Sequence, residues 1–420
     1  MNFADIPEHI AFRARAREWI AANAPWEHLD AVRRLRFAGG GAEDDHESLV
    51  MAQRWQKKKF DAGWACLVWP KSYGGQGLGP AENVIFQEEE GHFTELSNPF
   101  LIGQGFIAPT LMKYATEEQK CRLLPPLASG ESIWCQLFSE PGAGSDLAGV
   151  RTRAERRGDS WRINGQKVWT SGAHYSEWGL LLARTDPDVP KHAGITMFFV
   201  RMNSPGITVR PVRQLSGAAH FNEVFFDDVD VPDEQRLGTV NNGWHVALTT
   251  LTNERMALGA TVPVGFDELF DLASQPGADG VAPIESEHVR MQLADWYAKV
   301  SGMRFGVYRQ LTAMAQGRSP GAEAAVGKLA GASATQDIAA FGLDLLGARG
   351  RAADAGNTHG GVRAETFHAM FAFGAIHRLE GGTDEVLRNI IAERVLGLPP
   401  DVRTDRGPFR DVPTAPAKSV

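Results

Sequence analysis

Residues 378–385, near the C-terminus, read Arg378-Leu379-Glu380-Gly381-Gly382-Thr383-Asp384-Glu385, and a helix-like run to Arg394 follows them. The two adjacent glycines leave room beside this loop. Because helix N-termini favour anions, a phosphate group fits beside Thr383 and Glu385. Asp384 and Glu385 also suit a helix start as simple partners of the helix dipole. The stretch therefore predicts a glycine loop that leads into a helix, with a ligand-binding or a purely structural role.

Further distinctive segments occur along the chain. Residues 139–146 read Ser-Glu-Pro-Gly-Ala-Gly-Ser-Asp, so their backbone can approach a ligand closely and offer N–H groups. A single Gly-Ala-Gly-Ser segment usually forms only a turn. Here it stands in order with other blocks: Gly63-Trp64, Trp69-Pro70 and Tyr73-Gly74-Gly75, residues 114–120 and 124–126, Lys167-Val168-Trp169-Thr170-Ser171-Gly172, and residues 221–229.

In this order the blocks resemble the acyl-CoA dehydrogenase family over residues 55–398. The resemblance implies an α+β, mostly α fold with an N-terminal helical domain, a middle β-barrel-like domain and a C-terminal helical bundle. It implies FAD as the cofactor and the α,β-dehydrogenation of an acyl-CoA to the 2-enoyl-CoA, with electrons passed to an electron-transfer flavoprotein. It also implies a homodimer or homotetramer, because a neighbouring subunit completes the flavin sites of the family.

The spacing of apolar residues predicts where the domains begin and end. Helical spacing extends from Ile10 to about Leu127, strand-like runs such as residues 195–200 replace it after Ser132, and helical spacing returns from Gly243. Asn164-Gly165 predicts a tight turn between two strands. Strands segregated from helices argue against a Rossmann plan. We expect helical domains at residues 1–131 and 242–400, a β domain at 132–241, and a tail at 401–420 that joins no core.

Composition excludes several functions. The chain has 420 residues, 43% of them hydrophobic, which is enough for two or three domains with a large core. A net charge of −8 gives no basic field for phosphates, so we expect no nucleic-acid partner. Cys66, Cys121 and Cys135 lack metal-ligand spacing and are odd in number, which favours reduced thiols in the cytoplasm and no metal site. No apolar run approaches the roughly 20 residues that span a bilayer.

The resemblance also implies which residues hold FAD. Ser139 corresponds to a position that bonds the pyrimidine end of the flavin, and Ser145 to one between cofactor and substrate. Trp169 corresponds to a residue that shields one flavin edge, although tryptophan is also a good core filler, and Ser171 to one that offers a hydroxyl to N5. The expected cofactor-binding set is Phe138, Ser139, Gly144, Ser145, Trp169, Ser171, Gly347, Thr383 and Glu385.

One departure from the family concerns the adenosine end of FAD. Many members carry an Arg-x-x-Phe-Gly segment after the helix that begins near residue 245, and it reaches FAD in the neighbouring subunit. This sequence instead reads Phe-Asp-Glu-Leu-Phe at residues 266–270, followed by a loop from Gln275 to Pro283. We therefore expect either that other groups hold the adenosine across the dimer interface or that FAD binds more weakly there.

The second departure concerns the catalytic base. The family reaction needs a carboxylate in a dry site, with its pKa raised toward working pH, to take the α-proton. The usual family pattern is Glu-Gly-Thr, and alignment on Gly382-Thr383 places Gly381 at the base position and Glu380 one residue too early. The backbone N–H of Gly381 can still polarise the thioester carbonyl.

Some family members place the base on the helix that opens the C-terminal domain, just before an arginine. That position is Glu254 here, followed by Arg255, which we expect to bind substrate together with Ser145. A glutamate in mid-helix is usually a solvated surface residue, but the glycine at 381 favours Glu254 as the base. Glu380 is the alternative base, and a site without a base is the third possibility.

Three functions fit these motifs. The first is an FAD-dependent acyl-CoA dehydrogenase, favoured by the carboxylate at Glu254 and the hydroxyl of Ser171. The second is a flavin monooxygenase on the same fold, which needs no base. The third is a non-catalytic partner subunit of a hetero-oligomer, against which the near-complete flavin motifs argue. The room at the paired glycines favours branched or bulky acyl chains.

Overall fold

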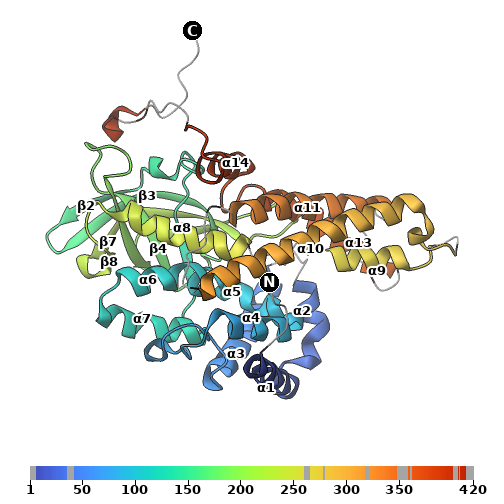
Figure 1. The fold of residues 1–420 in the computed structure, drawn as a ribbon. Helices are drawn as coiled ribbons and strands as arrows, with labels where there is room; N and C mark the ends of the chain where they lie inside the picture. The colour runs from blue at the N-terminus through green and yellow to red at the C-terminus, as the bar shows by residue number, and fades with distance from the viewer. Residues whose placement is uncertain are drawn as a thin grey trace, which may run out of the picture.

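The computed structural model describes residues 6–35, 42–259, 265–277, 280–316, 322, 324–347, 358–359, 362–400, 405 and 407–412. It has the predicted mostly helical α+β architecture. Figure 1 shows helices of the N-terminal third packed on one side of a sheet and a long group of C-terminal helices that extends away from it.

The N-terminal third is helical as predicted. Its α7 begins with a capping box, in which the Thr116 hydroxyl accepts from Gln119 N and the Gln119 side chain accepts from Thr116 N. Trp55, Phe86 and Phe93 are among the buried side chains of its own core. Its elements are α1 Pro7–Asn23, η1 Trp26–His28, α2 Leu29–Leu35, α3 Ala42–Asp61, η2 Lys71–Tyr73, α4 Pro80–Glu89, η3 Gly91–Ser97, α5 Asn98–Phe100, η4 Leu101–Ile107, α6 Ala108–Tyr114 and α7 Glu117–Ser129.

An eight-stranded sheet forms the middle of the chain, in the order β6-β7-β3-β2-β4-β5-β8 with β1 beside β4. Both faces of β4 and β5 are buried, because these strands are apolar along almost their whole length, whereas β7 alternates between buried and more exposed residues. The elements are β1 Trp134–Leu137, η5 Leu147–Gly149, β2 Arg153–Arg157, β3 Ser160–Ser171, β4 Trp178–Arg184, β5 Ile195–Arg201, β6 Ile207–Val212, β7 Phe221–Pro232, η6 Asp233–Gln235 and β8 Arg236–Leu237.

The predicted turn at Asn164-Gly165 is wrong, because β3 continues through it. The pairing of β3 with β7 instead shifts register between Ile163 and Gly165. A Cβ on Gly165 would lie 2.6 Å from Thr152 Cα and 2.5 Å from Thr152 Oγ1. Glycine is needed there for the close approach of Thr152, not for a hairpin.

The C-terminal elements are again helical. α10 and α11 run side by side and pack with α9 and α13 around Leu269, Trp296 and Phe367. The elements are α8 Gly243–Gly259, α9 Phe266–Ser274, η7 Pro283–Glu285, α10 Glu287–Ala315, α11 Ala324–Leu346, β9 Thr358–His359, β10 Val362–Arg363, α13 Ala364–His377, α14 Asp384–Ile390, η8 Ile391–Val395 and η9 Phe409–Asp411.

Helix α8 lies where the three groups of elements meet. It contacts η4 and α6 of the N-terminal third, β5 of the sheet and α11 of the C-terminal helices. Its residues Val246 and Ala247 are fully buried in a core shared with Leu111 of α6 and Phe199 of β5. A side chain on α8 can therefore reach elements from all three parts of the chain.

Residues 407–412 of the predicted tail do join a core, contrary to the prediction for that part of the tail. Phe409 is only 4% exposed, and its N–H donates to Val189 O at 2.9 Å. The Phe409 ring lies 3.8 Å from the guanidinium carbon of Arg184, a favourable cation–π distance. The apolar ring and this buried arginine fix residues 407–412 against the sheet.

Two absences concern the described residues alone. None of their helices is long and apolar enough to cross a membrane. No group of three or more of their His, Cys, Asp and Glu side chains is arranged to hold a metal ion.

Candidate active site

The first two predicted flavin-contact segments lie side by side. The N–H of Val168 on β3 donates to Ser139 O at 2.9 Å. The adjacent Lys167 ammonium donates to Phe138 O at 2.9 Å and to Glu140 Oε1 at 2.8 Å. The segment that carries Trp169 and Ser171 is thus fixed to the loop that begins at Phe138 and Ser139.

Glu140 closes that loop at its other end. Its carboxylate accepts from the N–H groups of Arg151 and Thr152 at 2.7 and 2.9 Å, in addition to Lys167. Burial tends to raise the pKa of Glu140, but the Lys167 ammonium and the two N–H groups outweigh it and hold that pKa below its usual value. A charged Glu140 thereby fixes the base of the loop that presents Gly144 and Ser145.

Gly144 and Ser145 lie exposed at the outer part of this loop. Beside them, the Asp146 carboxylate accepts from the Lys191 ammonium at 2.8 and 2.7 Å, and Lys191 also contacts Asp405 of the tail. Asp146 thus braces the turn. The Ser145 hydroxyl is left at the surface, where a ligand can reach it.

Trp169 is held in an unusual conformation. Its φ of +60° lies in the left-handed region, which is uncommon for a bulky residue, and it coincides with a register shift between Lys167 and Thr170. The indole is 58% exposed and meets the Phe221 ring edge-on at 5.9 Å. A strained backbone that presents a large apolar surface to solvent fits a ligand-binding role better than a core role.

Glu254 projects from α8 toward β1. Gln136 Nε2 donates to its Oε2 at 3.0 Å. Burial raises the pKa of Glu254, the nearby negative charge of Glu380 raises it further, and the Gln136 hydrogen bond opposes both. The carboxyl group is therefore half-buried and has a raised pKa, as the reaction requires of a general base.

Glu380 is held by another partner. Its Oε1 lies 2.6 Å from His377 Nδ1, one turn earlier in the chain, and the residue is half-buried. The Glu380 carboxylate is therefore bound to an imidazole of its own segment.

Gly381 and Gly382 have φ values of +60° and +102°, which glycine adopts without strain. No hydrogen bond of the described residues uses the Gly381 N–H. The Lys328 ammonium donates to Gly382 O at 2.7 Å, and burial lowers its pKa against the pull of three carboxylates, Glu380, Asp384 and Glu254. The glycine loop, Lys328 and Glu254 therefore form one neighbourhood.

Thr383 and Glu385 lie at the start of α14. The Thr383 hydroxyl accepts from Val386 N at 3.3 Å and so caps the helix. Glu385 is exposed in the first turn, whereas Asp384 is buried and bound to the guanidinium of Arg378 at 2.6 and 2.8 Å. The structural role that the sequence allowed for this helix end is thus present, and a role toward FAD stays a prediction.

The remaining predicted residues, Gly347 and Arg255, form no hydrogen bond with the other candidate site residues that the structure describes. Gly347 follows α11 with a φ of +56°, and residues 348–350, which follow it, lie outside the described part of the chain. Arg255 donates to Leu251 O of its own helix at 3.2 Å. In place of the missing adenosine segment, α9 buries Leu269 and Leu272 in the C-terminal core.

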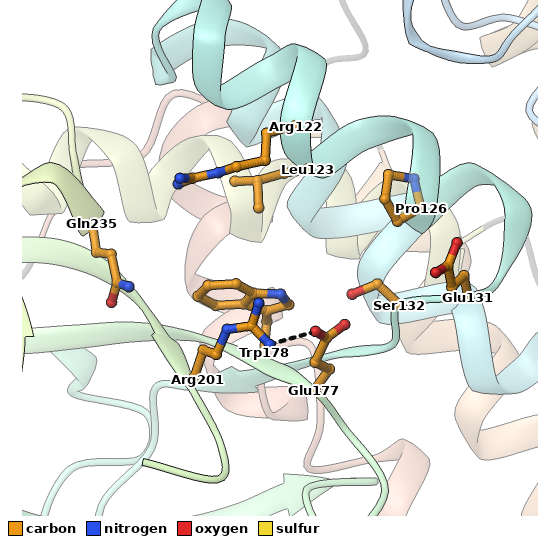
Figure 2. Close-up of a pocket in the computed structure, with 9 residues that line it drawn as sticks. All are labelled: Arg122, Leu123, Pro126, Glu131, Ser132, Glu177, Trp178, Arg201 and Gln235. Atoms are coloured by element: carbon orange, nitrogen blue, oxygen red, sulfur yellow. Dashed lines mark hydrogen bonds and ion pairs between the residues drawn. The ribbon is translucent and has the colours of Figure 1, made fainter.

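A cavity of about 280 Å³ between α7 and the sheet is not this site. Figure 2 shows its lining, with the Trp178 indole between Arg122 of α7 and Arg201 of β5. Arg201 is bound to Glu177 at 2.7 Å, so its charge is already compensated. None of the predicted site residues lines this cavity.

Sequence reasoning missed three residues of the neighbourhood, namely Gln136, Lys328 and His377. Gln136 is the one amide in the otherwise apolar run Trp-Cys-Gln-Leu, and Lys328 is the lone basic residue of the Ala-rich run 324–346. A single polar side chain in an apolar segment is a signal of a buried polar contact. His377 stands three residues before Glu380, the helical spacing that brings side chains together.

Comparison with known proteins identifies the class. Family models for the N-terminal, middle and C-terminal domains of acyl-CoA dehydrogenase match residues 7–131, 135–229 and 241–396. Acyl-CoA dehydrogenase IpdE1 of Mycobacterium tuberculosis is 36% identical over 394 residues, 93% of this chain and 98% of that protein. Acyl-CoA dehydrogenase FadE34 of the same organism is 40% identical over 344 residues, 81% of this chain and 45% of that protein.

Two solved structures indicate the same class of protein. The "Tcur3481-Tcur3483 steroid ACAD" superimposes with a TM-score of 0.79 at 31% identity and covers 96% of this chain and 100% of that one. The "ChsE4-ChsE5 complex from Mycobacterium tuberculosis" gives a TM-score of 0.76 at 30% identity, over 96% of this chain and 100% of that one.

The fold and the site define an FAD-dependent oxidoreductase that acts on a CH–CH bond. The chain belongs to the acyl-CoA dehydrogenase family, which confirms the resemblance found in the sequence. The residues fit FAD: an exposed, strained indole at Trp169 stands beside a loop that offers the hydroxyls of Ser139 and Ser145.

A double substitution tests the two flavin contacts on β3. Trp169→Ala with Ser171→Ala removes the exposed indole and the adjacent hydroxyl, so FAD binding should weaken about tenfold or more, the sum of one aromatic contact and one hydrogen bond. FAD content of the purified protein, from its absorbance, measures this. Trp26→Ala is the control, because Trp26 is also a partly exposed tryptophan but lies far from β3 in the sequence. Full FAD content with unaltered flavin reduction in the double variant would remove both residues from the site.

Proposed function

We propose that Glu254 is the base of this dehydrogenase and that the Gly381 N–H holds the substrate carbonyl. The observation that carries the proposal is the position of the Glu254 carboxyl group: half-buried, raised in pKa, and close to a glycine loop at which the side chain of the usual base is missing. Glu380 is one residue before Gly381, which stands at the usual base position, and its carboxylate is bound to His377.

The chemistry divides between the chain and its cofactor. Glu254 takes the proton from the α-carbon of the thioester, and the electron pair of that C–H bond forms the α,β double bond. The Gly381 N–H donates to the carbonyl oxygen, on which negative charge develops. FAD, when bound, supplies the acceptor for the hydride that leaves the β-carbon. Trp169 and the loop 139–146 orient the reacting groups and exclude water.

Substitution of Glu254 by glutamine tests the assignment. Glu254→Gln keeps size and hydrogen bonding but cannot accept a proton, so the rate of flavin reduction by acyl-CoA should fall about 10²–10⁴-fold while FAD and acyl-CoA still bind. In the unsubstituted enzyme the same rate should fall as pH decreases, because protonation of a carboxyl group with a raised pKa removes the base. Stopped-flow absorbance of the flavin measures both.

Glu380→Gln is the control for this experiment. It removes the alternative carboxylate and its bond to His377, and the rate should stay within a few-fold of the unsubstituted enzyme. A fast Glu254 variant with a dead Glu380 variant would assign the base to Glu380 instead. If both variants stayed fast, the reaction would have to proceed without either carboxylate.

We propose a bulky, ring-containing acyl-CoA as the substrate class. Two observations support this: the paired glycines at 381 and 382 place no side chain beside the site, and one similar structure is called a steroid ACAD. In a panel of acyl-CoAs, kcat/KM for ring-containing or branched thioesters should exceed that for short straight chains by about tenfold or more. Equal or greater activity on butyryl-CoA would contradict the proposal.

We propose that the enzyme works in the cytoplasm as a homodimer or homotetramer and passes electrons to an electron-transfer flavoprotein. Exposed apolar side chains on α10, α11 and α13 support assembly, namely Met291, Tyr297, Phe305, Val326 and Phe371. Light scattering should give the mass of two or four 45.8 kDa chains. A stable, FAD-loaded monomer would rule the assembly out. Each chain would consist of helical domains at residues 1–131 and 242–400 with a β domain at residues 132–241 between them.

A further inference from the structure

We propose that Gln136 is the positioning residue of Glu254: its side-chain amide holds the carboxylate before proton transfer and the carboxylic acid after it. The inference rests on the proposed role of Glu254 as base, and it adds a second residue to that step. Gln136 touches neither the substrate nor the reacting carbon atoms in this proposal. It acts through Glu254 alone.

The backbone of Gln136 is firmly placed. It lies third in β1, whose residues pair in parallel with β4, and Gln136 stands opposite Leu180. Its neighbours Cys135 and Leu137 are fully buried. A side chain that projects from a strand fixed in this way has little freedom except in its own torsions, so the amide meets Glu254 in a defined direction.

The amide meets a single partner. Gln136 Nε2 donates to Glu254 Oε2 at 3.0 Å, while Gln136 Oε1 is buried and has no hydrogen-bond partner among the described residues. A buried amide oxygen without a donor costs free energy, about 1–3 kcal/mol in mutational series. The unpaired oxygen therefore indicates a role beyond packing, because an apolar side chain would fill this position without that cost.

Proton transfer gives that oxygen a role. An ionised carboxylate only accepts hydrogen bonds, but a protonated one also donates. Once Glu254 has taken the α-proton, rotation of the Gln136 amide presents Oε1 as an acceptor for the new O–H. Since the two ends of the amide are nearly equal in shape, both protonation states of Glu254 are satisfied by one side chain without movement of β1.

Other charged groups around Glu254 act at longer range. Helix α8 packs against η4, α6, α11 and β5. Its own Arg255, with Lys328 from α11, lowers the pKa of Glu254, and Glu380 of the glycine loop raises it. Segment η4 has no ionisable side chain, Lys113 of α6 lies beside Thr249, and Arg201 of β5 is bound to Glu177. Among the described residues, Gln136 is thus the direct hydrogen-bond partner of the Glu254 side chain.

The test is the pH dependence of flavin reduction in Gln136→Leu holoenzyme. Leucine is close to glutamine in size but donates nothing, so the ionised form of Glu254 loses its stabilising bond. The acid limb of the pH–rate profile should move to higher pH, and the rate at pH 7 should fall about tenfold, as expected for one lost hydrogen bond to a charged group. Gln136→Asn, one methylene shorter, should behave like Gln136→Leu because its amide cannot reach.

Gln166→Leu is the matched control. Gln166 Nε2 donates to Glu223 Oε1 at 2.9 Å, a partly buried Gln–Glu pair with a similar hydrogen-bond distance that joins β3 to β7. This variant should leave the pH profile unchanged, which separates a role toward the base from a general effect of a lost amide. FAD content and melting temperature, measured for every variant, identify any that fails to fold.

A double variant separates this inference from the proposed function. With Glu254→Gln present there is no base to position, so adding Gln136→Leu should slow flavin reduction no further. An unchanged pH profile in Gln136→Leu, with Glu254→Gln inactive, would overturn the role of Gln136 and leave the base assignment intact. Loss of FAD without a shift of the profile would overturn it too and make Gln136 a cofactor contact. A fully active Glu254→Gln would instead contradict the proposed base.

Discussion

The buried ion pair between Lys167 and Glu140 is the interaction on which the geometry of the site depends. Lys167 is fully buried and Glu140 is 8% exposed, so both charges have lost their hydration. Desolvation of this kind costs several kcal/mol per ion, and a buried pair is seldom a net source of stability. What it provides here is position: Lys167 binds Phe138 O, and Glu140 binds the far end of the loop at Arg151 and Thr152.

The strain at Trp169 lies directly beside this pair. The pairing of β3 with β7 shifts register between Lys167 and Thr170, and Trp169, with its φ of +60°, lies within that shift. Such a conformation costs about 1–3 kcal/mol and persists only where the surroundings enforce it. The Phe221 edge and the hydrogen bond from Val168 to Ser139 are part of that enforcement.

The two candidate bases also have fixed surroundings. The negative charge of Glu380 lies close enough to raise the pKa of Glu254, and the two carboxylates have separate partners, His377 and Gln136. Lys328 stands near both and binds the carbonyl of Gly382. The left-handed backbone at Gly381 suits glycine better than a residue with a side chain.

The sequence by itself determined the family, the helix–sheet–helix order and the segments from which the candidate site is built, because backbone-limited motifs such as residues 139–146 and 378–385 depend on local composition. It failed at Asn164-Gly165, where a local turn signal was overridden by the approach of Thr152, and at Phe409, whose partner Arg184 is more than two hundred residues away. Only the tertiary structure showed that Gln136, Lys328 and His377 surround the two candidate bases. Hydrogen bonds between side chains distant in sequence leave no periodic pattern, so folding alone decides them.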